Sequence, residues 1–403
     1  MSDAPRPAEA GGEDDTPHGV IWTLSACNFV IGMGAFVVIG LLEPVADGFG
    51  VTRGEAGALM TVYAIAYAIL SPLLVSATGR IGRRRVMALG LAVFAAGSAL
   101  CALAPTLWAM MAGRAVAAAG AGMFTPVSAA VAAALAAPEA RGRALATVVV
   151  GLSLAQVAGV PAGGWIAYTF GWRGAFWLIL ALALIGVALV WTRVPQGLRL
   201  APVTLRDLGG VLRDRLAMGA VLFTASFLAA VFVLYTYLTP LLGETMGWGR
   251  DGITLLLVIY GAGAVLGNLM GGWMADRLGA VRTLVVLTLC QIAVMPVFSG
   301  LPYPEAAVMA LAFLWALVGW SFMAAQQLRL LAIAPEEASV VLALNAAAIY
   351  IGAALGSALG GAVLGAFGIG ALGIAGGLAA CWVLAHILWS RRAALRAGRG
   401  TAA

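Results

Sequence analysis

Two charged residues lie next to otherwise apolar sequence and are the first candidates for chemistry. Arg114 is inside the apolar stretch 106–136, and Glu43 is at the end of the apolar stretch 20–45. If both stretches cross a membrane, the two side chains lie at similar depth and could pair. A guanidinium there costs several kcal/mol unless it faces protein or water. A functional role for Arg114 is therefore predicted, and the alternative is that it only ties helices together.

Uncharged polar and aromatic residues lie in the middle of the apolar stretches. Each alone is more often a packing residue than a ligand contact. Together they predict a cavity that offers aromatic rings and amides but no charge, which suits a neutral or lipophilic solute better than a strong ion. The set comprises Asn28, Tyr63, Tyr67, Gln156, Tyr235, Tyr260, Asn268, Trp315, Trp320, Gln326, Asn345 and Tyr350.

Clusters that would support enzymatic or metal chemistry are missing from the sequence. The only two histidines are His18 and His386, and none of the 17 acids falls in the middle of an apolar stretch. An intramembrane acyl or glycosyl transferase would need clustered His, Asp or Glu, so no enzymatic activity is predicted. The four cysteines lie in apolar runs without metal-ligand spacing, and neither a metal nor a cofactor is expected.

The elements that position these residues are predicted to be membrane-spanning helices. The 403-residue chain is 63% hydrophobic and 10% charged, with a mean hydropathy of +1.01, whereas soluble domains are about 25% charged. About 20 apolar residues cross a bilayer. Spans are predicted near 20–45, 54–77, 85–104, 106–136, 142–169, 173–193, 216–242, 252–275, 281–300, 304–332, 338–366 and 369–390.

The distribution of arginine predicts the orientation. With an even number of spans both termini lie on one side, and most arginines fall in the loops of that side, while Arg53, Arg173 and Arg250 fall in the opposite loops. Because cytoplasmic loops carry the excess of basic residues, both termini are predicted to be cytoplasmic, in a bacterial inner membrane. The formal charge of +6 does not indicate nucleic-acid binding, because the arginines form no soluble basic face.

Two six-helix bundles are predicted, residues 20–193 and 216–390. A cytoplasmic linker, residues 194–215, joins them; it contains Pro195, Gly197, Pro202 and an amphipathic stretch, 203–212, that predicts a short surface helix. Residues 1–19 are expected to form a disordered cytoplasmic tail, and residues 391–403 a basic cytoplasmic tail.

Two sequence matches predict that the bundles are copies of one unit. Arg-x-Gly follows the second span at Arg80 and the eighth span at Arg277, 197 residues later. The first and seventh spans end in Pro44 and Pro240, which are 196 residues apart. Nearly equal offsets at corresponding spans indicate a duplicated six-helix unit.

The loop after the eighth span resembles the signature of the major facilitator superfamily, Gly-x-x-x-Asp-Arg-x-Gly-Arg-Arg/Lys. It matches at Gly272, Asp276, Arg277 and Gly279. The resemblance covers about residues 20–390 and implies an all-α membrane protein, with twelve transmembrane helices in two pseudo-symmetric six-helix bundles.

The first half keeps only part of this signature. Arg80, Gly82, Arg83 and Arg84 match, but Val75 replaces the leading glycine and Gly79 replaces the aspartate. The resemblance implies that the two loops form a cytoplasmic gate, whose residues are Arg80, Gly82, Arg83, Asp276, Arg277 and Gly279. Without the first carboxylate we expect an asymmetric latch dominated by the second half; the alternative for the first loop is a simple positive anchor.

Two further motifs are similar to those of drug–proton antiporters, in particular bacterial twelve-span efflux permeases of the arabinose, purine and chloramphenicol-resistance type. Arg114 resembles the arginine of the span-four motif, although Ala117 and Ala118 replace its Gln and Gly. Span five resembles the antiporter motif with Gly151, Gly159, Pro161, Gly163 and Gly164, although Val160 alters its Gly-Pro core.

The resemblance assigns roles to these two motifs. It implies that Arg114, with Glu43, takes part in proton coupling, and that span five seals the protein against leak. The span-five glycines allow a neighbouring helix to approach closely, and Pro161 permits a bend. Close packing alone is the alternative.

The sequence thus predicts a secondary active transporter, with proton-coupled efflux of small neutral or amphiphilic compounds (drugs, sugars, nucleobases or metabolites) by alternating access. Its partners would be the solute, protons and membrane lipid, and a monomer is expected. An importer or an uncoupled facilitator with the same fold is the alternative. A substrate-sensing receptor would need an added soluble domain, which the sequence does not contain.

Overall fold

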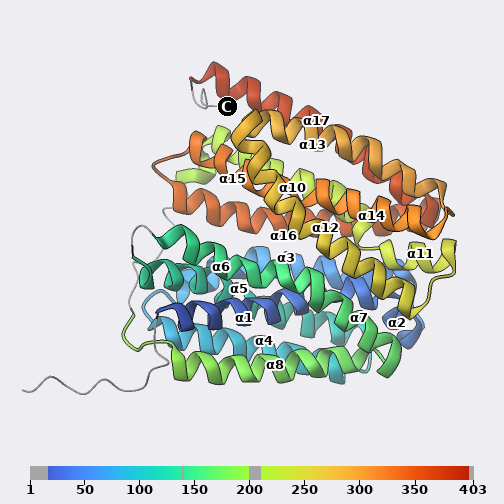
Figure 1. Ribbon diagram of the computed structural model, residues 1–403. Coiled ribbons are helices and arrows are strands. Elements are labelled where there is room, and N and C mark those ends of the chain that lie inside the picture. The colour runs from blue at the N-terminus through green and yellow to red at the C-terminus, as the bar shows by residue number, and fades with distance from the viewer. Residues whose placement is uncertain (1–16, 138–139, 199–209, 399–403) are drawn as a thin grey trace, which may run out of the picture.

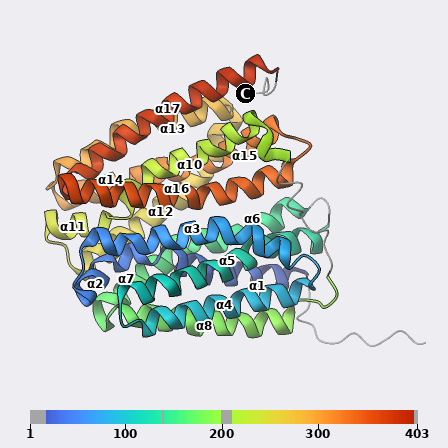
Figure 2. The ribbon, with the colours of Figure 1, turned by 180° about the vertical axis from the view of Figure 1, so that it is seen from behind.

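The computed structural model describes residues 17–137, 140–198 and 210–398. Within these ranges twelve helical stretches are long and apolar enough to cross a membrane. They form two bundles, the first coloured blue to green and the second yellow to red in Figure 1 and, from behind, in Figure 2. The predicted fold class is confirmed. Most of the predicted linker helix and of the N-terminal tail, and the end of the basic tail, lie outside the described residues.

The first bundle is built of six spans, of which two are interrupted. Its elements are α1 (Pro17–Phe36), α2 (Val38–Phe49), α3 (Arg53–Ala77), α4 (Arg83–Leu103), α5 (Leu107–Leu135), α6 (Arg141–Leu154), the π-helix η2 (Ala155–Gly159), α7 (Val160–Phe170) and α8 (Trp172–Arg193). Helices α1 and α2 together form the first span, and α6, η2 and α7 form the fifth.

The second bundle also has six spans, but apart from its first span the interruptions fall in different places. Its elements are α10 (Arg215–Tyr235), α11 (Leu238–Met246), α12 (Arg250–Leu278), α13 (Ala280–Val294), the 3₁₀-helix η3 (Met295–Gly300), α14 (Glu305–Trp320), α15 (Phe322–Ile333), α16 (Ala338–Phe367), the 3₁₀-helix η4 (Ile369–Ala371) and α17 (Leu372–Arg396).

The offset of 197 residues seen in the sequence recurs in the structure. Helices α3 and α12 begin 197 residues apart, as do α4 and α13, and α6 and α16. Two pairs of turn glycines with positive φ show the same offset, Gly50 with Gly247 and Gly171 with Gly368. Positive φ is strained for residues with a Cβ, so the duplicated backbone turns explain why glycine recurs at these positions.

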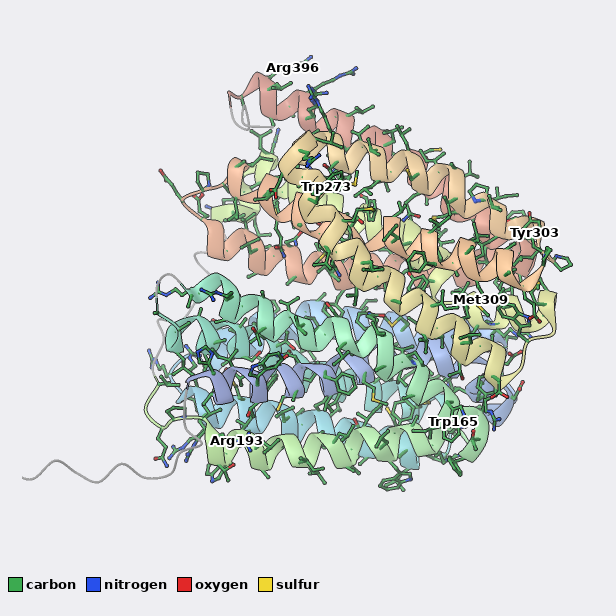
Figure 3. All side chains as sticks on the ribbon, in the orientation of Figure 1. Trp165, Arg193, Trp273, Tyr303, Met309 and Arg396 are labelled. Carbon is green, nitrogen blue, oxygen red and sulfur yellow. The ribbon has the colours of Figure 1, made fainter. Side chains whose placement is uncertain are left out.

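The two ends of the bundles differ and are named here for reference. The termini face is the end where α1 begins and α17 ends; Arg193 and Arg396 lie there in Figure 3. The far face is the opposite end, where Trp165 and Tyr303 lie in Figure 3. In Figures 1 and 2 the helices of the two bundles diverge toward the termini face.

The first and seventh spans break at matching places. The first is interrupted at Val37, between α1 and α2, and the seventh at Thr236 and Tyr237, between α10 and α11. Proline has no N–H to donate to the carbonyl four residues earlier, and Pro44 and Pro240 lie shortly after the breaks. The breaks leave two short helices, α2 and α11, which pack against each other across the two bundles at the far face.

Candidate functional site

Arg114 lies on α5 and is fully buried, with 1% of its surface exposed. Its guanidinium donates to three backbone carbonyls, those of Gly34, Ala35 at 2.8 Å and Leu59 at 3.5 Å. Its carbon Cζ lies 4.2 Å from the centre of the Tyr63 ring. The charge is therefore surrounded by oxygen atoms and an aromatic face, both of which stabilise a cation.

The break in the first span supplies these carbonyls. Gly34 and Ala35 belong to the last turn of α1, and carbonyls in the last turn of a helix have no partner within it. The same end carries the negative pole of the helix dipole. Because α1 stops in the middle of the bundle, Arg114 finds a partial negative charge there without a carboxylate.

The prediction that Arg114 pairs with Glu43 was wrong. Glu43 lies beyond the break, on α2, which carries it toward the far face. There its carboxylate forms an ion pair with Arg53 at 2.9 Å and accepts a hydrogen bond from the Tyr168 hydroxyl at 3.4 Å.

An aromatic contact joins the two bundles beside Arg114. Tyr67 of α3 stacks on Tyr350 of α16, with ring centres 3.7 Å apart, and Tyr63 lies 6.2 Å from Tyr350. The Tyr63 hydroxyl is buried and has no hydrogen-bond partner among the residues that the structure describes. Polar atoms of this kind are rare in protein interiors, so Tyr63 is a group on which a solute could form a hydrogen bond.

A second aromatic cluster occupies the corresponding place in the other bundle. The Tyr235 hydroxyl donates to Gln156 Oε1 of the first bundle at 2.9 Å, and its ring stacks on Tyr260 at 4.5 Å. Trp315 packs edge-on against Tyr260 at 5.4 Å, and Trp320 Nε1 donates to the Tyr260 hydroxyl at 3.3 Å. Tyr260 follows Tyr63 by the 197-residue offset of the repeat, with Trp315 near its ring in place of the guanidinium of Arg114.

Of the predicted cavity residues, Tyr63, Gln156, Tyr235 and Trp320 thus make contacts near the boundary between the bundles. The three asparagines bond within their own bundles instead. Asn28 donates to Ser128 Oγ at 2.8 Å, Asn345 Oδ1 accepts from Thr224 Oγ1, and Asn268 donates to a carbonyl of its own helix. Asn28 Oδ1 is buried without a partner among the described residues.

The glycines of span five lie against the broken first span. A Cβ on Gly151 would lie 1.9 Å from the carbonyl oxygen of Ser25, so no larger residue fits there without moving a helix. A Cβ on Gly159 or Gly163 would also be crowded, at 2.9 Å from Met33 Cβ and 2.3 Å from Val37 Cγ2, whereas on Gly164 it would be in ordinary contact with Gly40 O at 3.4 Å.

Pro161 is accommodated by the π-helix that precedes it. The N–H of Val160 bonds to Ala155 O, five residues earlier, instead of four. Insertion of a π-turn is one of the ways in which a helix absorbs a local disturbance. This π-helix also contacts the other bundle, since a Cβ on Gly261 of α12 would lie 2.5 Å from Val157 Cα.

Further contacts between the bundles lie toward the far face. Thr239 Oγ1 donates to Ile39 O at 2.7 Å, and Ser357 Oγ donates to Gly57 O at 3.0 Å. Arg53 bonds to Glu244 of the other bundle. A small cleft of about 300 Å³ lies beside these contacts between α3 and α16. These bonds hold the far face closed.

The two signature loops lie at the termini face and differ in detail. Asp276 is exposed and has no hydrogen-bond or ion-pair partner among the described residues, and Arg277 lies 4.8 Å over the ring of Trp273. In the first loop Arg80 is exposed, whereas Arg83 is buried and its N–H donates to Leu198 O at 3.2 Å.

The glycines of these loops also differ. Gly279 has φ +82 and ψ 156, whereas Gly82 has φ −56 and ψ 135, which other residues adopt. The backbone of the second loop thus depends on glycine and that of the first does not.

Sequence reasoning missed the role of Arg53 and Glu244. The sequence predicts Arg53 in a loop on the side opposite the termini and gives no partner for it. The repeat carries no signal for the pair, because Arg250, 197 residues after Arg53, pairs with Asp251 of its own helix.

Twelve spans in two related bundles, with a buried polar and aromatic boundary between them, define a membrane transporter for a small-molecule solute. The chain belongs to the Major Facilitator Superfamily, whose family model matches residues 24–327 and 239–403. The resemblance predicted from the signature loops is confirmed. Membership points to transport of a solute across a membrane rather than to catalysis.

Similar proteins support the same assignment. The uncharacterized MFS-type transporter YbcL of Bacillus subtilis (strain 168) is 30% identical over 342 residues, which cover 84% of this chain and 87% of that protein. The inner membrane transport protein YdhP of Escherichia coli (strain K12) is 30% identical over 341 residues, covering 84% and 87%.

A solved structure shows the same fold. It is a bacterial homolog of the human lysosomal transporter Spinster, in an inward-facing and unoccupied conformation. The TM-score is 0.78 at 15% sequence identity, with coverage of 97% of this chain and 100% of that one.

Proposed function

We propose that the protein exports small neutral or amphiphilic compounds across a bacterial inner membrane in exchange for protons, with both termini in the cytoplasm. The observation that carries the choice of solute is the boundary between the bundles. It is formed by the rings of Tyr63, Tyr67, Tyr350, Tyr235 and Tyr260 and contains no carboxylate in the middle of a span. Aromatic faces and hydroxyl groups bind neutral and lipophilic molecules well.

The direction of transport is proposed from the span-five motif and its contacts. Gly151 and Pro161 belong to a segment that packs closely on α1 and α2 and, through the π-helix, reaches α12 of the other bundle. Such close backbone packing leaves little space for water or ions between the spans. An exporter driven by a proton gradient requires a seal of this kind, because a leak would dissipate the gradient.

Proton coupling is assigned to Arg114 and Glu43. Arg114 supplies a fixed positive charge in the middle of the bundle, held at the end of α1. Glu43 is the carboxylate near this region that keeps a path to solvent, since 20% of its side chain is exposed. In this proposal Glu43 takes up a proton from outside once the solute has left, and the field of Arg114 favours the later release of that proton.

The gate at the termini face is proposed to close in the other conformation of the transport cycle, in which the far face is open. In the present structure the far face is closed and Asp276 is unpaired within the described residues. When the termini face closes, Asp276 is expected to meet the positive N-terminal end of a neighbouring helix. Because Gly79 replaces the aspartate in the first signature loop, one such contact between a carboxylate and a helix end is expected instead of two.

The proposal is tested by the uptake of a panel of neutral and amphiphilic compounds into everted membrane vesicles, with and without a pH gradient. Uptake that depends on the gradient is expected for the native protein. Replacing Arg114 with Ala should abolish gradient-driven uptake, whereas Arg114→Lys should retain part of it because the charge is kept. Gradient-driven uptake at the native rate by a correctly inserted Arg114→Ala protein would contradict the coupling role.

A second candidate function is an importer or uncoupled facilitator of a neutral solute. The lack of an acid in the middle of any predicted span favours it, because a proton carrier usually needs a protected ionisable group. Solute flux in both directions that ignores the pH gradient would support this candidate over export.

A further inference from the structure

Arg53, at the start of α3, binds one carboxylate from each bundle. Its Nη2 atom lies 2.9 Å from Glu43 Oε1, in its own bundle, and its Nη1 atom bonds to Glu244 Oε2 of the other bundle. The side chains are partly exposed, by 33% for Arg53, 20% for Glu43 and 50% for Glu244. One guanidinium is thus shared between two acids at the far face.

The repeat provides a comparison position. Arg250 begins α12 at the place where Arg53 begins α3, but its ion pair is with Asp251, the next residue of its own helix, at 2.7 Å. That ion pair lies within one helix, whereas the contacts of Arg250 with the first bundle are a hydrogen bond to Thr169 Oγ1 at 3.5 Å and the ring of Trp165 at 5.8 Å. The shared pairing at Arg53 is therefore a feature of the first bundle and does not follow from the repeated position alone.

The surroundings of Glu43 fit a shared, exchangeable partner. The Tyr168 hydroxyl of α7 lies 3.4 Å from Glu43 Oε2, and Asp47 is one turn further along α2. On the other bundle Gly243 lies directly against the carboxylate, since a Cβ there would be 2.8 Å from Oε2. Among the described residues, the charged groups found near Glu43 are thus the cation Arg53 and the acids Asp47 and Glu244.

We propose that Arg53 and Glu244 form the latch of the far face, and that a proton bound by Glu43 strengthens this latch. When Glu43 is ionised, it competes with Glu244 for the guanidinium. When a hydronium ion from outside transfers its proton to Glu43, an O–H bond forms on the carboxyl and the group no longer holds Arg53 as an ion pair. Arg53 keeps its own proton and is then available to Glu244 alone.

This inference rests on the proposed function for its orientation, because the far face is taken as the outer one. It adds a consequence to that function. An external proton favours closure of the outer face, which is the step that an exporter must take after its solute has left. The two carboxylates thus have opposite effects, since Glu244 closes the face and ionised Glu43 weakens the closure.

The proposal can be tested by the distance between spin labels on the two bundles at the far face. Phe170 and Phe367 are suitable positions, because both are exposed, by 71% and 78%, and occupy the same place in the two repeats. They would be replaced by labelled cysteines in protein with Cys290 and Cys381 changed to Ser; Cys27 and Cys101 are buried. The protein would be measured in lipid nanodiscs by double electron–electron resonance across a range of pH.

Three variants separate the outcomes. Glu244→Gln should shift the population toward longer distances by roughly two- to fivefold, the effect of one partly exposed ion pair. Glu43→Gln should shift it toward shorter distances and remove most of the pH dependence. Asp251→Asn, the control, should change the distances far less than Glu244→Gln, since the ion pair that it removes lies within one helix and joins no acid of the other bundle.

The latch is refuted if Glu244→Gln behaves like Asp251→Asn, and the role of Glu43 is refuted if the pH dependence survives in Glu43→Gln. These outcomes are independent of the proposed export. Distances that respond as expected in a protein whose vesicle transport ignores the pH gradient would retain the latch and reject proton-driven export. Gradient-driven export by a protein whose spin-label distances do not respond would retain proton-driven export and reject the latch.

Discussion

Adding one methyl group at Gly261 should shift the balance between the two conformations of the transporter. Gly261 of α12 lies against the π-helix of the other bundle, and a Cβ built there is 2.5 Å from Val157 Cα and 2.8 Å from Gln156 O. Ordinary contacts begin at 3.4 Å, so α12 and the π-helix must separate by about 1 Å. Both obstructing atoms are backbone atoms and cannot turn away as a flexible side chain could.

The size of the effect follows from the cost of overpacking. Inserting a methyl group into a packed contact costs about 1–3 kcal/mol. Because this contact joins the two bundles, the cost applies to the conformation described here and is relieved when the bundles move apart at this point. A difference of about 1–3 kcal/mol between two states changes their ratio about 5- to 150-fold.

Two neighbouring glycines of the same helix provide controls for Gly261→Ala. At Gly271 a Cβ would lie 1.8 Å from Ser321 O, within the same bundle, whereas at Gly272 nothing lies within 4 Å. Gly271→Ala should therefore lower the thermal stability in every conformation. Gly272→Ala should be neutral or slightly stabilising, since alanine favours a helix by about 1 kcal/mol over glycine.

The assay combines thermal unfolding in detergent with the spin-label distance across the far face. Gly261→Ala is expected to move the distance distribution with only a small loss of stability, and Gly271→Ala to lower the melting temperature without that movement. If Gly261→Ala gave the same distances as Gly272→Ala, the contact between α12 and the π-helix would not distinguish the two conformations, and the reasoning would fail.

Three further predictions concern the gates. Gly279→Ala should destabilise the protein by about 1–3 kcal/mol, because φ +82 with ψ 156 is a conformation that essentially only glycine adopts; Gly82→Ala, with φ −56, should be nearly neutral, and equal melting temperatures would contradict this. Thr239→Val removes the hydrogen bond to Ile39 O and should weaken closure of the far face by about 1 kcal/mol, seen as longer spin-label distances, whereas unchanged distances would argue against it. Asp276→Asn should leave the described conformation unaffected, because the carboxylate has no partner there among the described residues, and should slow transport by weakening the opposite state; a native transport rate would exclude a latch role.

The positions of the spans and the duplication could be predicted from the sequence. Apolar length alone identifies a membrane helix, because lipid requires every backbone polar group to be satisfied within the helix. The offset of 197 residues between the Arg-x-Gly units predicted the duplication, and the starts of three pairs of helices show the same offset. The close approach at Gly151 was expected for a similar reason, because a glycine among apolar residues indicates a neighbouring backbone.

The partners of the charged residues could not be predicted in this way. Arg114 and Glu43 lie at similar depths in the sequence pattern, which made an ion pair between them plausible. The break at Val37 separates them, since it ends α1 below Glu43 and presents free carbonyls to Arg114. A helix can break inside a bundle where another group satisfies its free carbonyls. Here the carbonyls of α1 are satisfied by the guanidinium of Arg114, which belongs to α5.

The sequence by itself determined the class of this protein, because hydrophobic length, arginine placement and a repeated loop are local properties that depend on lipid and on backbone chemistry. Only the tertiary structure decided which charges meet. Arg53 reaches Glu43 and Glu244 because two broken spans bring their short helices together at the far face. The bond between Arg53 and Glu244 joins residues 191 positions apart in the chain, and no local pattern encodes it.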